Sequence, residues 1–207
     1  MKKRICCFIL AFIMIAICQA GCGKKDNGMK KVVLNEVAHS IFYAPQYVAI
    51  EMGYFKDAGI DLVLETGFGA DKTMTALISG NADIGFMGSE STIYAYAEGS
   101  KDYAVNFAGL TQRAGNFLVA REKIDNFSWD MVKGKNVLGG RKGGMPQMVL
   151  EYILKANNID PASDLSIDQS VDFGLTAGAF SGNTEYDFTV EFEPGATSLE
   201  KEGKGYV

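Results

Sequence analysis

The chain has 207 residues, 20 Lys and Arg against 25 Asp and Glu, and 47% apolar residues. This length and apolar content suffice for one domain or two small lobes with packed cores. The acidic balance argues against a nucleic-acid partner, because a polyanion is normally bound by a basic face.

The first residues have the pattern of an export signal. Met1-Lys2-Lys3-Arg4 is a basic start, and residues 5–18 form an uncharged apolar run that is too short to cross a membrane. All four cysteines lie in or directly after this run, so the body of the protein has no cysteine pair for a disulfide or a metal site. We therefore predict that residues 1–21 are a signal peptide. Its removal leaves 17 basic and 25 acidic residues, a net charge of −8.

The end of this leader resembles a lipobox. In Gln19-Ala20-Gly21-Cys22, small residues precede a cysteine, as in bacterial lipoproteins whose cysteine is acylated and becomes the new N-terminus. Gln19 stands where lipoproteins usually have an apolar residue, and the alternative is an ordinary secretory leader with an incidental cysteine. Lipidation of Cys22 would anchor the protein to a membrane surface, with residues 22–30 as anchor and flexible tether.

Beyond residue 31, apolar runs alternate with helical patterns. In the first half the predicted strands are residues 32–37, 60–65, 84–87 and 104–110, and the predicted helices are residues 44–52, 71–79 and 91–97. In the second half, strands at 117–120 and 136–139 alternate with helices at 129–132 and 146–157, and segments 166–171, 175–180, 187–191 and 196–202 continue the series. This alternation predicts an α/β fold with two lobes, each a mainly parallel sheet flanked by helices. The polar stretch 111–115 marks the seam, with residues 31–112 as lobe 1 and 113–207 as lobe 2.

Four segments in this order resemble a known family. They are the helix and Gly-Tyr-Phe turn of residues 43–60, the Gly-Asn-Ala-Asp strand entry of residues 80–86, the Gly-Lys-Asn-Val strand entry of residues 132–137, and the helix and Asn-Asn-Ile turn of residues 150–159. They are similar to the substrate-binding lipoproteins of ABC importers for thiamine pyrimidine precursors, nitrate, sulfonates and taurine, which have the type II periplasmic-binding-protein fold. Members of that family continue past the position of Val207, so the resemblance implies that the C-terminal return to lobe 1 is missing, which would leave an apolar face exposed.

The resemblance implies an extracytoplasmic solute-binding protein. It would be a monomer, anchored to the outer face of the cytoplasmic membrane or exposed to the periplasm, that captures a small molecule between its lobes and delivers it to permease subunits. A ligand site in such a fold forms where loops follow the carboxyl ends of the strands. The candidate ligand-binding residues in these loops are His39, Ser40, Phe42, Tyr43, Phe68, Ser89, Glu90, Gln112, Arg113, Arg141, Gly143, Gly144, Phe173 and Glu191.

The chemistry of these residues favours a flat heteroaromatic ligand such as a thiamine-pyrimidine precursor. Aromatic rings can stack on a heterocycle, and Glu90 or Glu191 can accept hydrogen bonds from its amino groups. The alternative is an aliphatic sulfonate, taurine or nitrate, because the glycine-rich turn of residues 140–146 could cradle an anion and Arg141 could pair with it.

A catalytic role is not indicated by the sequence. His39 is the only histidine, so neither a metal cluster nor a Ser-His-Asp triad can be assembled with ordinary partners. Fungal pyrimidine synthases share the fold but carry a cysteine-rich motif, and residues 23–207 contain no cysteine. We therefore predict a protein without catalytic residues, metal or cofactor; a synthase-like enzyme and a ligand sensor are the alternatives from other classes.

Overall fold

The structure, a computed structural model, describes residues 28–113 and 115–207. The predicted signal peptide, Cys22 with its predicted lipidation and most of the predicted tether lie outside the described residues, as does Ala114 in the predicted seam. The chain divides into residues 1–30 and residues 31–207, and the sheets and helices described below belong to the second unit, apart from Lys30 at the start of the first strand. In the described part of the chain, no helix is both long enough and apolar enough to cross a membrane.

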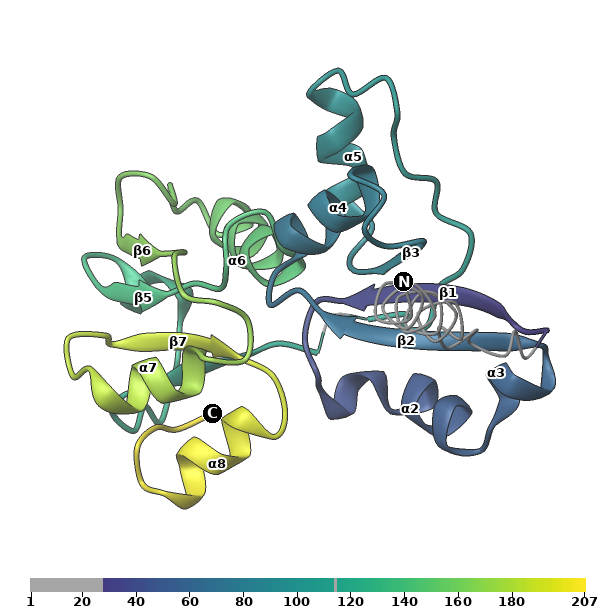
Figure 1. Ribbon diagram of the computed structural model, residues 1–207. Coiled ribbons are helices and arrows are strands. Elements are labelled where there is room, and N and C mark those ends of the chain that lie inside the picture. The colour runs from purple at the N-terminus through teal and green to yellow at the C-terminus, as the bar shows by residue number, and fades with distance from the viewer. Residues whose placement is uncertain (1–27, 114) are drawn as a thin grey trace, which may run out of the picture. The chain divides into compact units, whose positions relative to one another are not determined.

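The first half forms a three-stranded sheet in the order β2-β1-β3 (Figure 1). Its strands are β1 (Lys30–Glu36), β2 (Ile60–Thr66) and β3 (Ile84–Phe86), and β1 runs parallel to β3 with Leu34 opposite Ile84. The helices of this half are the 3-10 turn η1 (Ile41–Tyr43), α2 (Ala44–Glu51), α3 (Tyr54–Asp57), α4 (Ala70–Ile78) and α5 (Glu90–Ala97). Figure 1 shows α2 and α3 on one side of the sheet and α4 and α5 on the other.

The second half forms a four-stranded sheet in the order β4-β7-β5-β6. Its strands are β4 (Phe117–Ala120), β5 (Asn136–Leu138), β6 (Ser166–Asp168) and β7 (Phe188–Glu191). Strand β5 is parallel to both β6 and β7, and only the edge strand β4 is antiparallel to its neighbour. The helices are the 3-10 segment η2 (Trp129–Val132), α6 (Met145–Ala156), α7 (Thr176–Gly182) and α8 (Gly195–Lys201).

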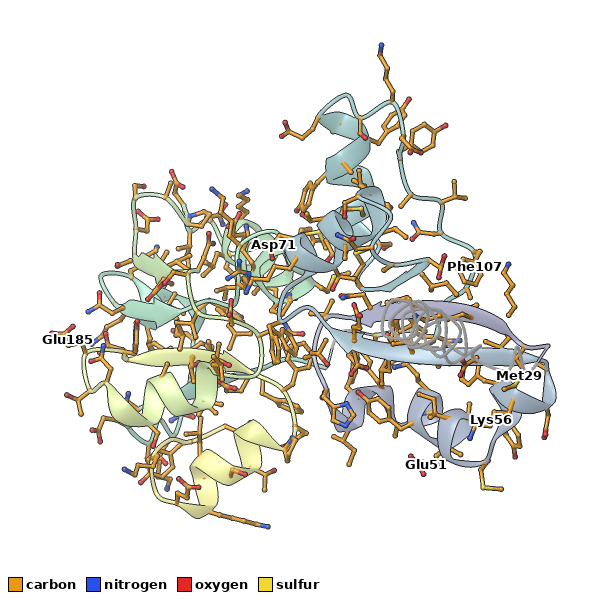
Figure 2. All side chains as sticks on the ribbon, viewed as in Figure 1. Met29, Glu51, Lys56, Asp71, Phe107 and Glu185 are labelled. Atoms are coloured by element: carbon orange, nitrogen blue, oxygen red, sulfur yellow. The ribbon has the colours of Figure 1, made fainter. Side chains whose placement is uncertain are left out.

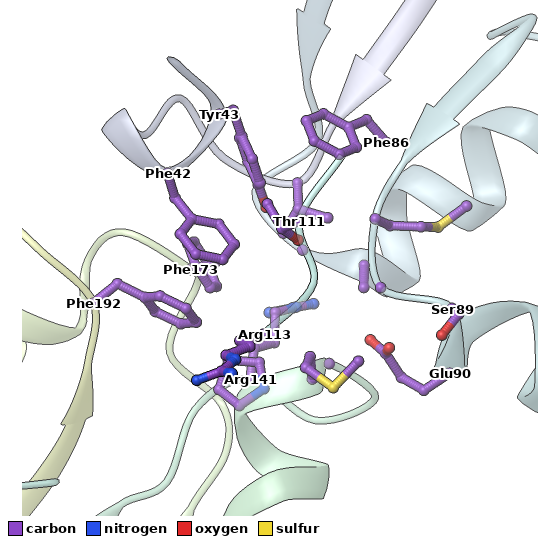
Figure 3. Close-up of a pocket in the computed structure, with 18 of the residues that line it drawn as sticks. Phe42, Tyr43, Phe86, Ser89, Glu90, Thr111, Arg113, Arg141, Phe173 and Phe192 are labelled. Carbon is purple, nitrogen blue, oxygen red and sulfur yellow. The ribbon is translucent and has the colours of Figure 1, made fainter. Parts of the chain in front are cut away.

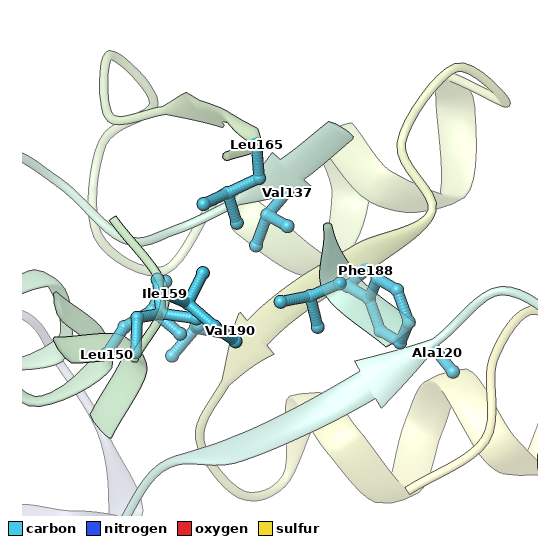
Figure 4. Packing of buried hydrophobic residues seen from close by; sticks show 9 residues of the cluster. Ala120, Val137, Leu150, Ile159, Leu165, Phe188 and Val190 are labelled. Carbon is cyan, nitrogen blue, oxygen red and sulfur yellow. The ribbon is translucent and has the colours of Figure 1, made fainter. Parts of the chain in front are cut away.

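Both faces of the second sheet are buried, which explains its continuous apolar strands. Successive side chains of a strand point to opposite faces. Val137 accordingly packs in one cluster with Leu150 and Leu154 of α6, whereas its neighbour Leu138 packs in another with helices α7 and α8. Figure 4 shows the first cluster, in which Phe188 and Val190 of β7 also lie. The two clusters fix the sheet between helical layers, and this confirms the predicted α/β class with mainly parallel sheets.

One predicted strand is wrong. Residues 104–110 are irregular backbone, and within the described residues no strand pairs with them. Val105 and Phe107 are 74% and 77% exposed, and Figure 2 shows Phe107 on the segment that leads away from α5. An apolar alternation becomes a strand only where a neighbouring strand satisfies its N–H and C=O groups. Residues 104–110 have no such neighbour in the described part of the chain.

Candidate ligand-binding site

A cavity of about 290 Å³, called the principal cavity below because most of the candidate residues line it, lies at the carboxyl ends of the strands. Loops from both sheets line it, together with the chain segment 111–113 that connects the two halves. This is the place where parallel α/β sheets bind ligands, because loops and helix N-termini converge there. The volume is at the lower end of the range for small-molecule sites, so it suits a ligand of one or two rings.

Five aromatic side chains form much of the cavity wall: Phe42, Tyr43, Phe86, Phe173 and Phe192. The rings of Tyr43 and Phe86 are 4.4 Å apart, and those of Phe173 and Phe192 are 5.1 Å apart. Figure 3 shows Phe42 between these two pairs, and its ring centroid is 5.6 Å from that of Phe192. Tyr43 remains neutral, since burial, and then the nearby Glu36, raise the pKa of its hydroxyl. Such a wall offers flat apolar faces on which a planar ligand can stack.

Glu90 supplies a buried carboxyl to this cavity. It is the first residue of α5 and is 2% exposed, yet neither of its oxygens has a hydrogen-bond partner among the described residues. Burial raises the pKa of the Glu90 carboxyl. The nearby backbone N–H groups of Glu90 and Met145 act in the opposite direction, although neither makes a hydrogen bond of good geometry with the carboxyl. Figure 3 shows the carboxyl directed toward the cavity. A buried acceptor without a partner is costly, so a donor on a ligand would be strongly favoured there.

Arg141 also lines the cavity, but two carboxylates already hold its guanidinium. Its Nε and one terminal nitrogen each donate to Asp71 at 2.8 Å, and the other terminal nitrogen donates to Asp172 at 2.6 Å. Lys72 completes the cluster by donating to Asp172 at 3.0 Å. The hydrogen bonds between Arg141 and Asp71 lower the pKa of the aspartate and raise that of the arginine. The two cations and two anions balance, which leaves little net positive field for an anionic ligand.

Three backbone donors of the glycine-rich turn before α6 already have partners within the protein. The N–H of Gly143 donates to the side chain of Gln147 at 2.6 Å, and the N–H of Gly144 donates to the carbonyl of Arg141 at 3.2 Å. The N–H of Lys142 is likewise bound to the carbonyl of Gln169. These three N–H groups are used within the protein and are not available to an anion.

A second cavity of about 460 Å³ adjoins the first, and Arg141, Pro146, Phe173 and Phe192 line both. Its wall includes Glu191, the last residue of β7, which is 4% exposed. One Glu191 oxygen accepts from Thr176 Oγ1 at 3.0 Å and the other from Thr189 Oγ1 at 2.8 Å. Burial raises the pKa of Glu191 to about 7, although both hydroxyls act in the opposite direction.

His39 and Ser40 also line this second cavity. His39 Nδ1 is 3.0 Å from Glu36 Oε1, and Glu36 is fully buried. Gln46 Nε2 and the Tyr47 hydroxyl donate to the other oxygen of Glu36 at 2.8 and 2.9 Å. This network satisfies the buried carboxylate and holds the loop that follows β1.

The structure brings most of the predicted site residues together. Those in the principal cavity are Phe42, Tyr43, Ser89, Glu90, Gln112, Arg113, Arg141, Gly144 and Phe173, and those in the second cavity include His39, Ser40 and Glu191. Phe68 and Gly143 are absent from the walls of both, and Phe68 is 49% exposed with a φ of 61°. The same principal cavity is also lined by residues outside the list of candidate ligand-binding residues: Val37, Gly69, Ala70, Phe86, Met87, Gly88, Thr111, Met145, Pro146 and Phe192. Phe86 and Phe192 were detectable in principle, because each ends or follows a predicted strand.

No three His, Cys, Asp or Glu side chains within residues 28–113 and 115–207 are grouped so that they could hold a metal ion.

Comparisons with known proteins identify several relatives. The model of a protein family described as NMT1/THI5 like matches residues 41–183. YtlA of Bacillus subtilis (strain 168), which carries the name of a binding protein, is 49% identical over all 207 residues, and the chain spans 61% of its length. The periplasmic nitrate-binding protein NrtA of Synechocystis PCC 6803 superposes with a TM-score of 0.61 at 19% identity, over 86% of this chain and 50% of that one. The alkanesulfonate-binding protein SsuA of Xanthomonas axonopodis pv. citri superposes with a TM-score of 0.57 at 14% identity, over 86% of this chain and 59% of that one.

Proposed function

The chain belongs to the NMT1/THI5-like family, and on that premise we propose that it is the extracytoplasmic solute-binding component of an ABC importer. Its fold is that of the type II periplasmic-binding proteins. The ligand would be captured in the principal cavity and delivered to the permease. Residues 1–21 would direct export, and acylated Cys22 would retain the protein at the membrane.

We further propose that the ligand is a flat heteroaromatic molecule that carries an amino group or a ring N–H, such as a thiamine-pyrimidine precursor. The observation that carries this proposal is the unpartnered carboxyl of Glu90 within an aromatic wall. The aromatic side chains provide stacking surfaces, and Glu90 provides the acceptor that fixes the orientation of the ring. A heterocyclic amine satisfies both requirements at once.

An anionic ligand is the alternative, since NrtA and SsuA are named for nitrate and alkanesulfonate. Three features of this chain count against it. Arg141 is already paired with Asp71 and Asp172, the N–H groups of Lys142, Gly143 and Gly144 are used internally, and the carboxyl of Glu90 would repel an anion when ionised. The other cationic side chain of this wall, Arg113, is exposed, so solvent and salt screen its charge.

The experiment is a thermal-shift and calorimetric comparison of 4-aminopyrimidine, methanesulfonate and nitrate on the full chain. We expect only 4-aminopyrimidine to raise the melting temperature; at a hundredfold excess over its Kd it should stabilise the fold by about 2.7 kcal/mol. In Glu90→Gln the affinity should fall about tenfold or more, because the charged acceptor is lost.

Glu193→Gln is the matched control, since Glu193 is exposed and its carboxylate is bound to Thr197. This variant should bind 4-aminopyrimidine like the unmodified chain. A shift with nitrate or methanesulfonate but not with 4-aminopyrimidine would refute the heteroaromatic assignment.

A further inference from the structure

The ligand of the principal cavity need not end there, because a second cavity adjoins it. Four residues line both spaces, and the rings of Phe173 and Phe192 stand at the junction. A substituent on a ring stacked in the principal cavity would pass these shared side chains to enter the second cavity. The second cavity has a volume of about 460 Å³, which is larger than that of the first.

Glu191 gives the second cavity its chemical character. It is a nearly fully buried carboxyl at the carboxyl end of a central strand, and the two donors that reach it, Thr176 and Thr189, are neutral hydroxyls. A carboxylate has about four lone-pair positions, so two hydroxyls leave capacity for further donors. In the described part of the chain, no cationic side chain forms an ion pair with Glu191.

The other charged groups of this cavity do not compensate Glu191. Arg141 is held by Asp71 and Asp172. His39 faces Glu36, and Glu193 is bound to Thr197 at the start of α8. Burial without a cation keeps Glu191 partly protonated near neutrality, and an arriving cation would reverse that.

We propose that the second cavity is a subsite for a protonated amine on a flexible tail of the ligand, with Glu191 as its partner. This inference rests on the proposed heteroaromatic ligand and defines it further: a ring that Glu90 orients and a basic substituent that Glu191 neutralises. The ligand class is then an amino-heterocycle with an aminoalkyl tail. The Thr176 and Thr189 hydroxyls hold the Glu191 carboxylate in place while it accepts the ammonium group.

The test uses 4-aminopyrimidines with a 5-(ω-aminoalkyl) tail of one to four methylenes, their ω-hydroxyalkyl isosteres and unsubstituted 4-aminopyrimidine. Binding to the full chain is measured by calorimetry at pH 7 in two buffers of different ionisation enthalpy. We expect one amino-tailed length to bind about tenfold more tightly than its hydroxyl isostere, as a charge-assisted hydrogen bond provides. Its binding should release protons, because the ammonium group shifts Glu191 toward its ionised form.

In Glu191→Gln both the tenfold preference and the additional proton release should vanish. The control Glu202→Gln, at an exposed acid that lines neither cavity, should retain them. Equal affinity for the amino and hydroxyl tails, or a preference that survives Glu191→Gln, would overturn the subsite and leave the heteroaromatic proposal intact. If none of the ring compounds binds, unsubstituted 4-aminopyrimidine included, the proposed function fails and the subsite fails with it.

Discussion

Replacement of Glu191 by Gln should change how the stability of the fold depends on pH. The carboxyl has a pKa of about 7 in the folded protein against an ordinary value of 4.5. Below pH 4.5 the group is protonated in both the folded and the unfolded state and has no effect on stability. Between pH 4.5 and 7 the unfolded chain loses this proton first, so the free energy of unfolding falls as the pH rises.

The size of this effect follows from the difference between the two pKa values. At 1.36 kcal/mol per pKa unit, the loss approaches about 3 kcal/mol at pH 8. The glutamine of the variant has no proton to lose and nearly the same shape, and the hydroxyls of Thr176 and Thr189 can rotate to serve its amide. The difference in unfolding free energy between Glu191→Gln and the unmodified chain should therefore increase by about 3 kcal/mol from pH 4.5 to pH 8.

The assay is urea denaturation at half-unit pH steps, with Glu193→Gln as the control for a carboxyl of the same loop. Contributions of all other titrating groups cancel in the difference between variant and unmodified chain, provided that they do not interact with residue 191. If the two stability curves stay parallel across this pH range, Glu191 is not protonated in the folded state and the reasoning from its burial is refuted.

Two further changes test the charge cluster and the core. Asp71→Asn should lower the free energy of unfolding in urea by no more than about 1 kcal/mol, since the ion pair with Arg141 is partly exposed. The same change should release Arg141 from Asp71, so that methanesulfonate raises the melting temperature. If methanesulfonate causes no shift, the role given to Asp71 is contradicted. Leu154→Ala should cost about 2–5 kcal/mol because its side chain is fully buried. Tyr152→Ala should cost less than about 0.5 kcal/mol, because this residue of the same helix is 71% exposed. Similar losses for both variants would refute the placement of α6.

The local elements were predictable because periodicity and glycine punctuation determine them. The strand at 136–138 and the helix at 145–156 lie within one residue of their predicted bounds. Residues 104–110 failed because an alternating apolar pattern specifies a strand only together with a partner, and sequence periodicity does not contain the partner. Val105 and Phe107 of this segment are exposed, which shows that burial against neighbouring elements, and not the alternating pattern alone, determines whether a strand forms.

The position of the site was predictable from the sequence, but the ion pairs among its charged side chains were not. Glu90 and Phe42 follow predicted strands, so their arrival at one cavity was expected from the topology of α/β sheets. Arg141 was interpreted as a possible anion contact because nothing local indicates that Asp71, 70 residues earlier, would hold it by two hydrogen bonds. Long-range pairing of this kind follows only from the folded arrangement of the two halves.

Gly88 bears on how this site could vary among related sequences. A Cβ atom added at residue 88 would collide with the carboxyl of Glu90 in the orientation that it has here. A side chain at position 88 and an inward carboxyl at position 90 therefore exclude each other, so these two positions should covary. Sequences that retain the pair Gly-x-Glu should share a preference for ligands with a donor group, whereas a larger residue at position 88 should accompany the loss of the acid and a different ligand.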